Sequence, residues 1–172
     1  MKLLLVEDHY GVEFHATLLR KLRGSSASGI RIRRVPAKEC NVAMVRKIKA
    51  MLFPEVASSK IVIVVDSEGA PPTEVARRIY THFKRSRGID MDRVRVAVVT
   101  PRHESWLCIG LGLNREACRS HPEDLIVRSH NLKSYEKRYL AKLAREIDVA
   151  KLMSEQDFRE YIDAIEWLCR DP

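Results

Sequence analysis

Five carboxylates from distant parts of the chain each lie close after an apolar run of the kind that forms strands. They are Glu7, Asp8, Asp66, Glu68 and Glu104. In a parallel α/β sheet the carboxyl ends of the strands meet at one edge, so these side chains are expected to converge there. Like charges repel, so such a cluster favours a bound cation, and Mg²⁺ or Mn²⁺ is the candidate cofactor. The alternative is that each acid only caps the helix that follows it.

Two further side chains next to Glu104 are candidates for catalytic roles. Arg102 has the planar guanidinium group that binds phosphate through two parallel hydrogen bonds. His103 is of the one residue type whose ordinary pKa allows proton transfer near neutral pH. The remaining histidines, His9 and His15 among them, have no spacing typical of ligands and are assigned structural roles.

The elements that would position these residues follow from hydrophobic periodicity. Strands are expected at Lys2–Val6, Ile30–Val35, Ile61–Asp66 and Val94–Thr100. The third is apolar on both faces, as in a central parallel strand, and the second alternates Ile with Arg, as in an edge strand. Helices are expected at Val12–Leu22, Asn41–Leu52 with Asn41 as its N-cap, and Pro71–Arg85. This alternation predicts an α/β fold with a mainly parallel four-stranded sheet joined by right-handed crossovers.

The C-terminal part is expected to be mainly helical. The pattern predicts helices at Glu104–Leu113, Ser134–Arg145 and Ser154–Cys169, and a further strand at Asp124–Val127. Ser154 and Asp157 resemble a capping box at the start of the last helix. We therefore expect an α/β core over residues 1–128 and a C-terminal helical extension over residues 129–172 that packs on it.

The charge of the chain indicates a polyanionic partner. The 172 residues carry a formal net charge of +8, and the hydrophobic fraction of 45% is ample for one core. A nucleic acid, DNA or RNA, is the expected partner, since each phosphate bound by Lys or Arg releases counterions. The candidate contacts are Arg31, Arg33, Arg77, Arg78, Lys84, Arg85 and Arg87. The edge strand at Ile30–Val35 is also a candidate surface for a homodimer.

The cysteines and the N-terminus indicate a location. Cys40, Cys108, Cys118 and Cys169 include no C-x-x-C pair, so each is expected to act as a small hydrophobic residue. The apolar run at Leu3–Val6 is too short for export or for spanning a membrane. We expect a cytoplasmic protein without a membrane partner.

Three segments in this order resemble the Toprim domain family: LLLVED at 3–8, IVIVVDSEG at 61–69 and PRHESWL at 101–107. The third is similar to a segment of the overcoming-lysogenisation-defect-like Toprim proteins and their small stand-alone relatives. The resemblance implies a Rossmann-like sandwich and Mg²⁺-dependent phosphodiester chemistry on nucleic acid. It implies general acid/base work for Glu7 and metal binding for Asp66 and Glu68, with Glu104 joining the cluster. Glu68 stands where the family has aspartate, and Asp8 where it has glycine.

Three functions remain open from the sequence. A hydrolytic nuclease is the leading interpretation, because nothing here supplies the additional domains of a topoisomerase or a primase. A non-catalytic nucleic-acid-binding module with a degenerate Toprim site is the second. The third is a receiver-type signalling domain, in which Asp66 accepts phosphate and Thr100 is the switch hydroxyl. The interval before Asp66 is longer than in receivers, and the Lys-Pro signature is missing.

Overall fold

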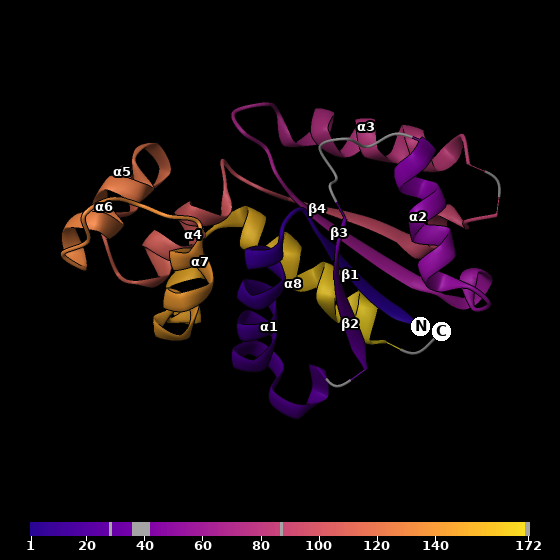
Figure 1. The fold of residues 1–172 in the computed structure, drawn as a ribbon, viewed down its shortest axis with the longest axis horizontal. Coiled ribbons are helices and arrows are strands. Elements are labelled where there is room, and N and C mark those ends of the chain that lie inside the picture. The colour runs from indigo at the N-terminus through magenta and orange to yellow at the C-terminus, as the bar shows by residue number, and fades with distance from the viewer. Residues whose placement is uncertain (28, 36–41, 87, 171–172) are drawn as a thin grey trace.

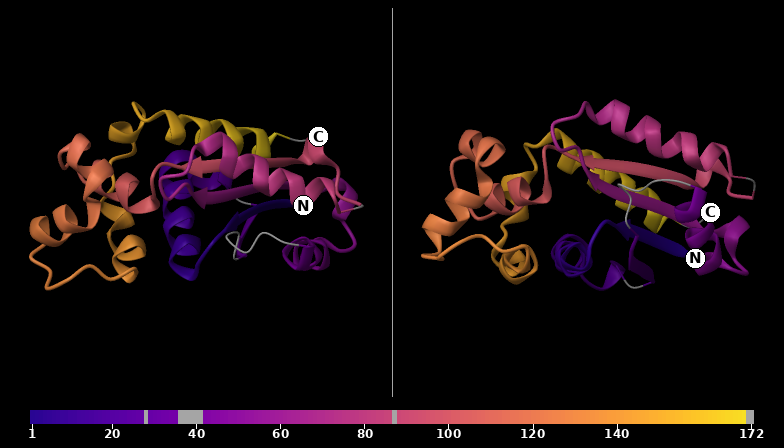
Figure 2. Two further views of the ribbon diagram at one scale, coloured as in Figure 1. Left: turned by 90° about the horizontal axis from the view of Figure 1, so that it is seen from above. Right: turned by 45° about the horizontal axis from the view of Figure 1, so that its top comes forward.

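The computed structural model of the protein describes residues 1–27, 29–35, 42–86 and 88–170 (Figure 1). Asn41 and Arg87 lie outside these residues, so the helix cap and the nucleic-acid contact expected of them are not described. The fold is α/β, with four strands in one sheet and helices on both of its faces (Figures 1 and 2). The predicted fold class is confirmed.

The sheet is parallel throughout and has the order β2-β1-β3-β4. Its strands are β1 (Lys2–Val6), β2 (Ile30–Arg34), β3 (Lys60–Asp66) and β4 (Val94–Val99). Strand β2 forms one edge, as its alternating Ile and Arg residues predict. In β3 the side chains from Ile61 to Val65 are buried on both faces, as expected of a central strand.

Two helices cover each face of the sheet (Figure 2). Helices α1 (His9–Arg23) and α8 (Gln156–Cys169) pack on one face, where Leu4 and Val62 contribute to the core. Helices α2 (Val42–Leu52) and α3 (Pro72–Lys84) pack on the other. Since successive strand residues point to opposite faces, the sheet separates two apolar cores.

Four short helices lie beyond the carboxyl ends of the strands, and the chain then returns along the sheet as α8 (Figure 1). These helices are α4 (His103–Gly110), α5 (Arg115–Ser120), α6 (Pro122–Ser129) and α7 (Arg138–Leu143). The indole N–H of Trp106 in α4 donates to Asp157 Oδ2 at 2.9 Å, and the Thr100 backbone N–H donates to the same oxygen at 2.8 Å. This carboxylate therefore joins α8 to the end of β4 and to α4.

Three local predictions for the C-terminal part are wrong. The strand expected at Asp124–Val127 lies inside α6, because Pro122 and the acidic Glu123 and Asp124 in its first turn favour a helix start. The helix expected from Ser134 begins only at Arg138. Helix α8 begins at Gln156 with Glu155 at its N-cap position, so Ser154 does not cap it.

Two of the four cysteines form a disulfide, contrary to the expectation of separate thiols. Cys108 in α4 is bonded to Cys118 in α5, and both residues are fully buried. Cys169 is a partly buried free thiol. The spacing rule missed the bond because the partners are ten residues apart, on two separate helices.

One apolar core combines side chains from both predicted parts of the chain. Leu140, Phe158 and Leu168 from the C-terminal extension cluster with Leu4 and Val62 of the sheet. The boundary after residue 128 stays a prediction. Within the described part of the chain, no helix is long and apolar enough to cross a membrane.

Candidate functional site

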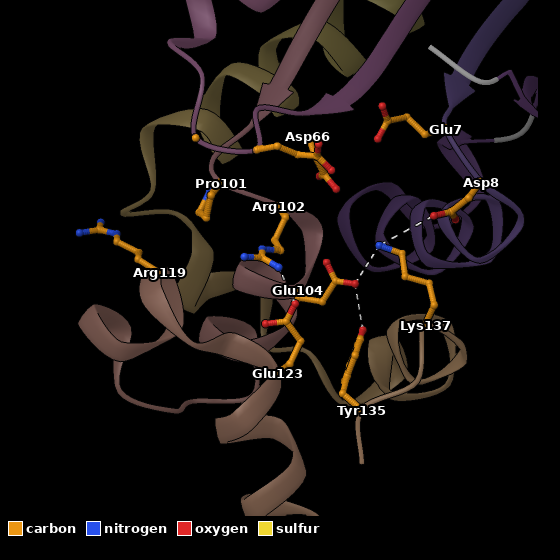
Figure 3. A pocket seen from close by; sticks show the side chains of 12 residues that line it. Glu7, Asp8, Asp66, Pro101, Arg102, Glu104, Arg119, Glu123, Tyr135 and Lys137 are labelled. Atoms are coloured by element: carbon orange, nitrogen blue, oxygen red, sulfur yellow. Dashed lines mark hydrogen bonds and ion pairs between the residues drawn. The ribbon is translucent and has the colours of Figure 1, made fainter. Parts of the chain in front are cut away.

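An open pocket of about 750 Å³ lies at the carboxyl ends of β1 and β3, between the sheet and helices α4–α7 (Figure 3). Six of the residues singled out from the sequence line it, namely Glu7, Asp8, Asp66, Glu68, Arg102 and Glu104. The other lining residues are Gly69, Pro101, Arg119, Glu123, Tyr135 and Lys137. The five carboxylates expected to converge therefore do line one cavity.

Asp8 has a structural partner of its own at the start of α1. Its Oδ1 accepts a hydrogen bond from the Gly11 backbone N–H at 2.6 Å, which makes it the N-cap of the helix. A Cβ atom at position 11 would lie 3.3 Å from that oxygen, so glycine permits the close approach. For Asp8 the helix-capping alternative considered from the sequence is therefore observed.

The loop after β3 holds Glu68 in an unusual backbone conformation. Glu68 has a φ of 50° and Gly69 a φ of 85°, both in the left-handed region. Hydrogen bonds to the β4–α4 connection maintain this turn, from Ser67 N to Val99 O at 2.8 Å and from Glu68 N to Pro101 O at 3.0 Å. Left-handed backbone in a residue other than glycine is strained and is often found at functional sites.

Asp66 ends β3 and lies at the N-terminus of α4. Its Oδ1 accepts hydrogen bonds from the His103 backbone N–H at 3.0 Å and from His103 Nδ1 at 2.5 Å. Both side chains are only 7% exposed. Burial acts to raise the pKa of Asp66, but the charge and hydrogen bonds of His103 outweigh it and lower that pKa. Burial likewise acts to lower the pKa of His103, and the charge of Asp66 outweighs it and raises that pKa. The two groups form a coupled, buried ion pair.

Glu104 is almost fully buried and is held by two residues from the segment before α7 (Figure 3). Its Oε1 accepts from Lys137 Nζ at 2.8 Å and from the Tyr135 hydroxyl at 3.1 Å. Lys137 Nζ also lies 3.8 Å from Asp8 Oδ2. Burial acts to lower the pKa of Lys137, but Glu104, Asp66 and Asp8 together raise it, so the lysine remains a cation within the acidic cluster. Burial and Glu104 raise the pKa of Tyr135, which remains a neutral donor.

Arginines flank the carboxylates on the side of the helices. Arg102 Nη1 donates to Glu123 Oε1 at 2.8 Å, and Arg119 Nη2 donates to Glu155 Oε2 at 2.9 Å. Both arginine side chains are close to half exposed, with 44% and 45% of their surface accessible. Each arginine is thus held in place by a carboxylate and remains accessible to an anionic ligand.

His103 does not line the pocket, although the sequence suggested it as a proton carrier there. Its Nδ1 faces Asp66, and its Nε2 lies 2.8 Å from Nε2 of His15 in the interior. His103 therefore contacts Asp66 from the interior of the protein and is not among the residues that line the cavity.

A second cavity of about 410 Å³ adjoins the same carboxylates from the side of α3. Glu7, Asp66 and Glu68 line both cavities, and Arg78 and His82 of α3 line only the second. The carboxylates are therefore accessible from two directions, with a basic side chain on each.

The described residues among those predicted to contact nucleic acid are exposed but lie on separate elements. Arg31 and Arg33 lie on β2 at one edge of the sheet. Helix α3 packs against β4 at the other edge of the sheet. It contains Arg77, Arg78 and Lys84, and Arg85 directly follows it. Arg78 is ion-paired with Glu74 on the same helix.

Several residues that shape the site were not singled out from the sequence. Tyr135 and Lys137 were expected only as part of the helix at Ser134–Arg145, whereas they lie in an irregular segment before α7. His15 did carry a signal, because it is a polar residue within the buried stripe of α1 that includes Phe14 and Leu18.

The donor set agrees in kind with a hard divalent cation, but it is not a preformed metal site. Mg²⁺ accepts one or two carboxylates and completes its shell with water and phosphate oxygens, which Asp66 and Glu68 would satisfy. Over the described ranges, however, no three His, Cys, Asp or Glu side chains are grouped to hold a metal ion. Lys137 supplies positive charge to the cluster instead. No protein-family model, no curated protein and no solved structure matches this chain.

Proposed function

We propose that this protein is a Toprim-type, cation-dependent nuclease that hydrolyses phosphodiester bonds in DNA or RNA. One observation carries the proposal: Glu7, Asp66 and Glu68, from the ends of β1 and β3, line one open pocket together with Glu104 of α4. Carboxylates gathered in this way are suited to cation-assisted phosphoryl chemistry.

The roles proposed for the side chains follow from their surroundings. Asp66 and Glu68 would hold the cation, and Glu7, directly after the neighbouring strand β1, would act as general acid/base. When bound, Mg²⁺ or Mn²⁺ neutralises phosphate charge and polarises the phosphoryl oxygen. Arg102 is exposed beside the carboxylates and binds a neighbouring phosphate.

The shape of the site supports a polymeric substrate. Two cavities share Glu7, Asp66 and Glu68, with Arg102 lining the first and Arg78 the second. A nucleic-acid strand that crosses the carboxylates would therefore meet a guanidinium group on either side of the bond to be cut. The net charge of +8 adds a long-range attraction for the same ligand.

The receiver-type alternative finds little support in the fold. The flavodoxin-like sheet of receiver domains has five strands in the order 2-1-3-4-5. The segment expected to form a fifth strand is helix α6, and the sheet formed by the described residues has four strands. A non-catalytic nucleic-acid-binding module is the second candidate, favoured by the position of Lys137 among the carboxylates.

The test is cleavage of plasmid DNA, single-stranded DNA and structured RNA with Mg²⁺ or Mn²⁺. We expect Asp66→Asn to reduce cleavage more than about 100-fold, since even outer residues of metal sites contribute 10–100-fold. The variant should fold, because the amide oxygen of asparagine still accepts from His103. Asp163→Asn, on the exposed surface of α8, is the matched control and should cut normally.

Two results would contradict the proposal. Equal cleavage by Asp66→Asn would mean that the chemistry occurs elsewhere. Binding of nucleic acid by the folded wild type without any cleavage, in the presence of either cation, would favour the non-catalytic module.

A further inference from the structure

A line of four hydrogen-bonded side chains runs from Asp66 into the centre of the protein. His103 Nδ1 lies 2.5 Å from Asp66 Oδ1, and His103 Nε2 lies 2.8 Å from His15 Nε2. His15 Nδ1 lies 3.0 Å from the hydroxyl of Tyr161. The four residues come from β3, α4, α1 and α8, and both His15 and Tyr161 are fully buried.

The chemistry of the groups fixes the direction of these hydrogen bonds when both histidines are neutral. The Asp66 carboxylate only accepts, so His103 must carry its hydrogen on Nδ1 and accept on Nε2. His15 must then donate from Nε2 and accept on Nδ1, where the Tyr161 hydroxyl donates. In this neutral state every hydrogen in the line points towards Asp66, and each ring nitrogen has a partner. When His103 is protonated and ion-paired with Asp66, its Nε2–H donates to His15 Nε2 instead.

Aromatic rings surround the four hydrogen-bonded side chains and exclude water from them, so each polar atom depends on its partner in the line. Phe14 contacts both histidines edge to face, with centroids 5.4 Å from His15 and 5.7 Å from His103. Trp106 lies 5.8 Å from the ring of His103 and 5.4 Å from that of Tyr161. Burial lowers the pKa of His15, and the positive charge of a protonated His103 lowers it further, which favours the neutral form of His15. A nitrogen left without a partner in these surroundings would carry the full cost of desolvation.

We propose that His15 and Tyr161 are positioning residues for the candidate site, which act on Asp66 through His103. Their hydrogen bonds fix the His103 ring so that its Nδ1–H and its backbone N–H both donate to Oδ1 of Asp66. The second carboxylate oxygen, Oδ2, is thereby left for a ligand in the pocket. The part of this inference that concerns the ligand rests on the proposed function.

Tyr161→Phe is the decisive variant, because it removes one hydroxyl and keeps the ring that packs on Trp106. The readout is the downfield ¹H resonance of His103 Nδ1–H and the ¹⁵N shifts of both histidines, recorded at alkaline pH with a chelator present. We expect Tyr161→Phe to shift the His103 signals and to speed the exchange of this proton with water. Tyr80→Phe is the matched control, because it removes a hydroxyl that contacts the Val96 backbone N–H in the other core.

Two substitutions of His15 separate positioning from packing. Glutamine places an N–H donor near the position of Nε2, so His15→Gln should retain the protected His103 proton. His15→Leu removes the donor and should abolish that protection. In calorimetric titrations with Mn²⁺, we expect about tenfold weaker binding by His15→Leu than by wild type, the lower end of the range for outer-shell partners.

The outcomes are distinguishable from a failure of the proposed function. Unchanged His103 signals in Tyr161→Phe, or equal proton protection in His15→Leu and His15→Gln, would overturn the positioning role. If the wild type binds no Mn²⁺ while the His103 signals respond as expected, the cation site is wrong and the positioning of Asp66 by His15 and Tyr161 stands.

Discussion

The two sides of the pocket are built in different ways. On the side of the sheet, Glu7, Asp66 and Glu68 come from the ends of strands whose backbones are fixed by parallel pairing. On the side of the helices, Lys137 and Tyr135 come from an irregular segment and reach Glu104 across 33 and 31 residues of sequence. The first side is mainly acidic, and the second pairs its carboxylates with cations.

The two sides differ in what places their functional groups in the pocket: the strand order places the acidic groups, and tertiary packing of the helices places the lysine and the tyrosine. Any parallel α/β sheet brings the carboxyl ends of neighbouring strands together, so acids placed after β1 and β3 must meet. Nothing in the strand order requires Lys137 to enter the same pocket. Its position depends on how α4–α7 pack on the rest of the molecule.

The largest expected effect comes from removing the disulfide of the helical side. Replacing Cys108 and Cys118 together by alanine should lower the free energy of unfolding by about 2–3 kcal/mol, since the bond closes a loop of about ten residues in the unfolded chain. Urea unfolding followed by circular dichroism would measure it. Cys169→Ala, at a partly buried free thiol, is the control. Failure to recover a peptide linking Cys108 to Cys118 by mass spectrometry without reductant would contradict the bond.

The same contrast explains what the sequence predicts well. Glu7 and Asp66 were predictable because each follows a short apolar run, and a parallel sheet then places both at one edge. Strand β3 was predictable because it is apolar on both faces. Helix α6 was not predictable in this way, because the apolar run Leu125–Val127 fits a strand as well as a helix. Pro122 and the acidic residues of the first turn favour the helix that is observed.

The partners of the site residues were not predictable, for a physical reason. His15 lies on the buried stripe of α1, so its burial follows from helical periodicity. Its hydrogen bond to Tyr161, however, spans 146 residues and depends on how α8 returns along the sheet. No local pattern encodes such a contact, because both helices would have the same amphipathic pattern if they packed elsewhere.

Lys137→Met would show whether the lysine of the helical side competes with a cation for the acidic side. Removing its charge leaves Asp8 and Glu104 without this counter-ion, so Mn²⁺ should bind about fivefold more tightly, or ~1 kcal/mol, the upper range for a partly exposed pair. Calorimetric titration measures the change. Lys142→Met, exposed on α7, is the matched control. Unchanged or weaker binding by Lys137→Met would mean that the lysine does not compete.

The smallest expected effect is the pH dependence of protein stability that arises from Asp66, His103 and His15, measured with a chelator present. Because the pKa of His103 is raised in the folded protein, its ion pair contributes fully to the free energy of unfolding below pH 6.5, its ordinary pKa. This contribution is lost as the pH rises through the higher pKa of the folded state. The lowered pKa of His15 has the opposite effect on stability. Below pH 6.5 the unfolded chain takes up a proton at His15 and the folded protein does not, so the free energy of unfolding falls as the pH falls. Because the pKa of Asp66 is lowered in the folded protein, its contribution to stability is lost only as the pH falls below 3.8, its ordinary pKa.

Together these three groups predict a stability maximum near pH 6.5, with changes of less than about 1 kcal/mol for a unit of pH on either side. Urea unfolding over a series of pH values would test this. Asp66→Asn should flatten the alkaline side, because His103 loses the charge that raises its pKa, while His9→Asn, at an exposed histidine, should leave the curve unchanged. An alkaline slope that survives in Asp66→Asn would mean that the ion pair between β3 and α4 does not control the titration of His103.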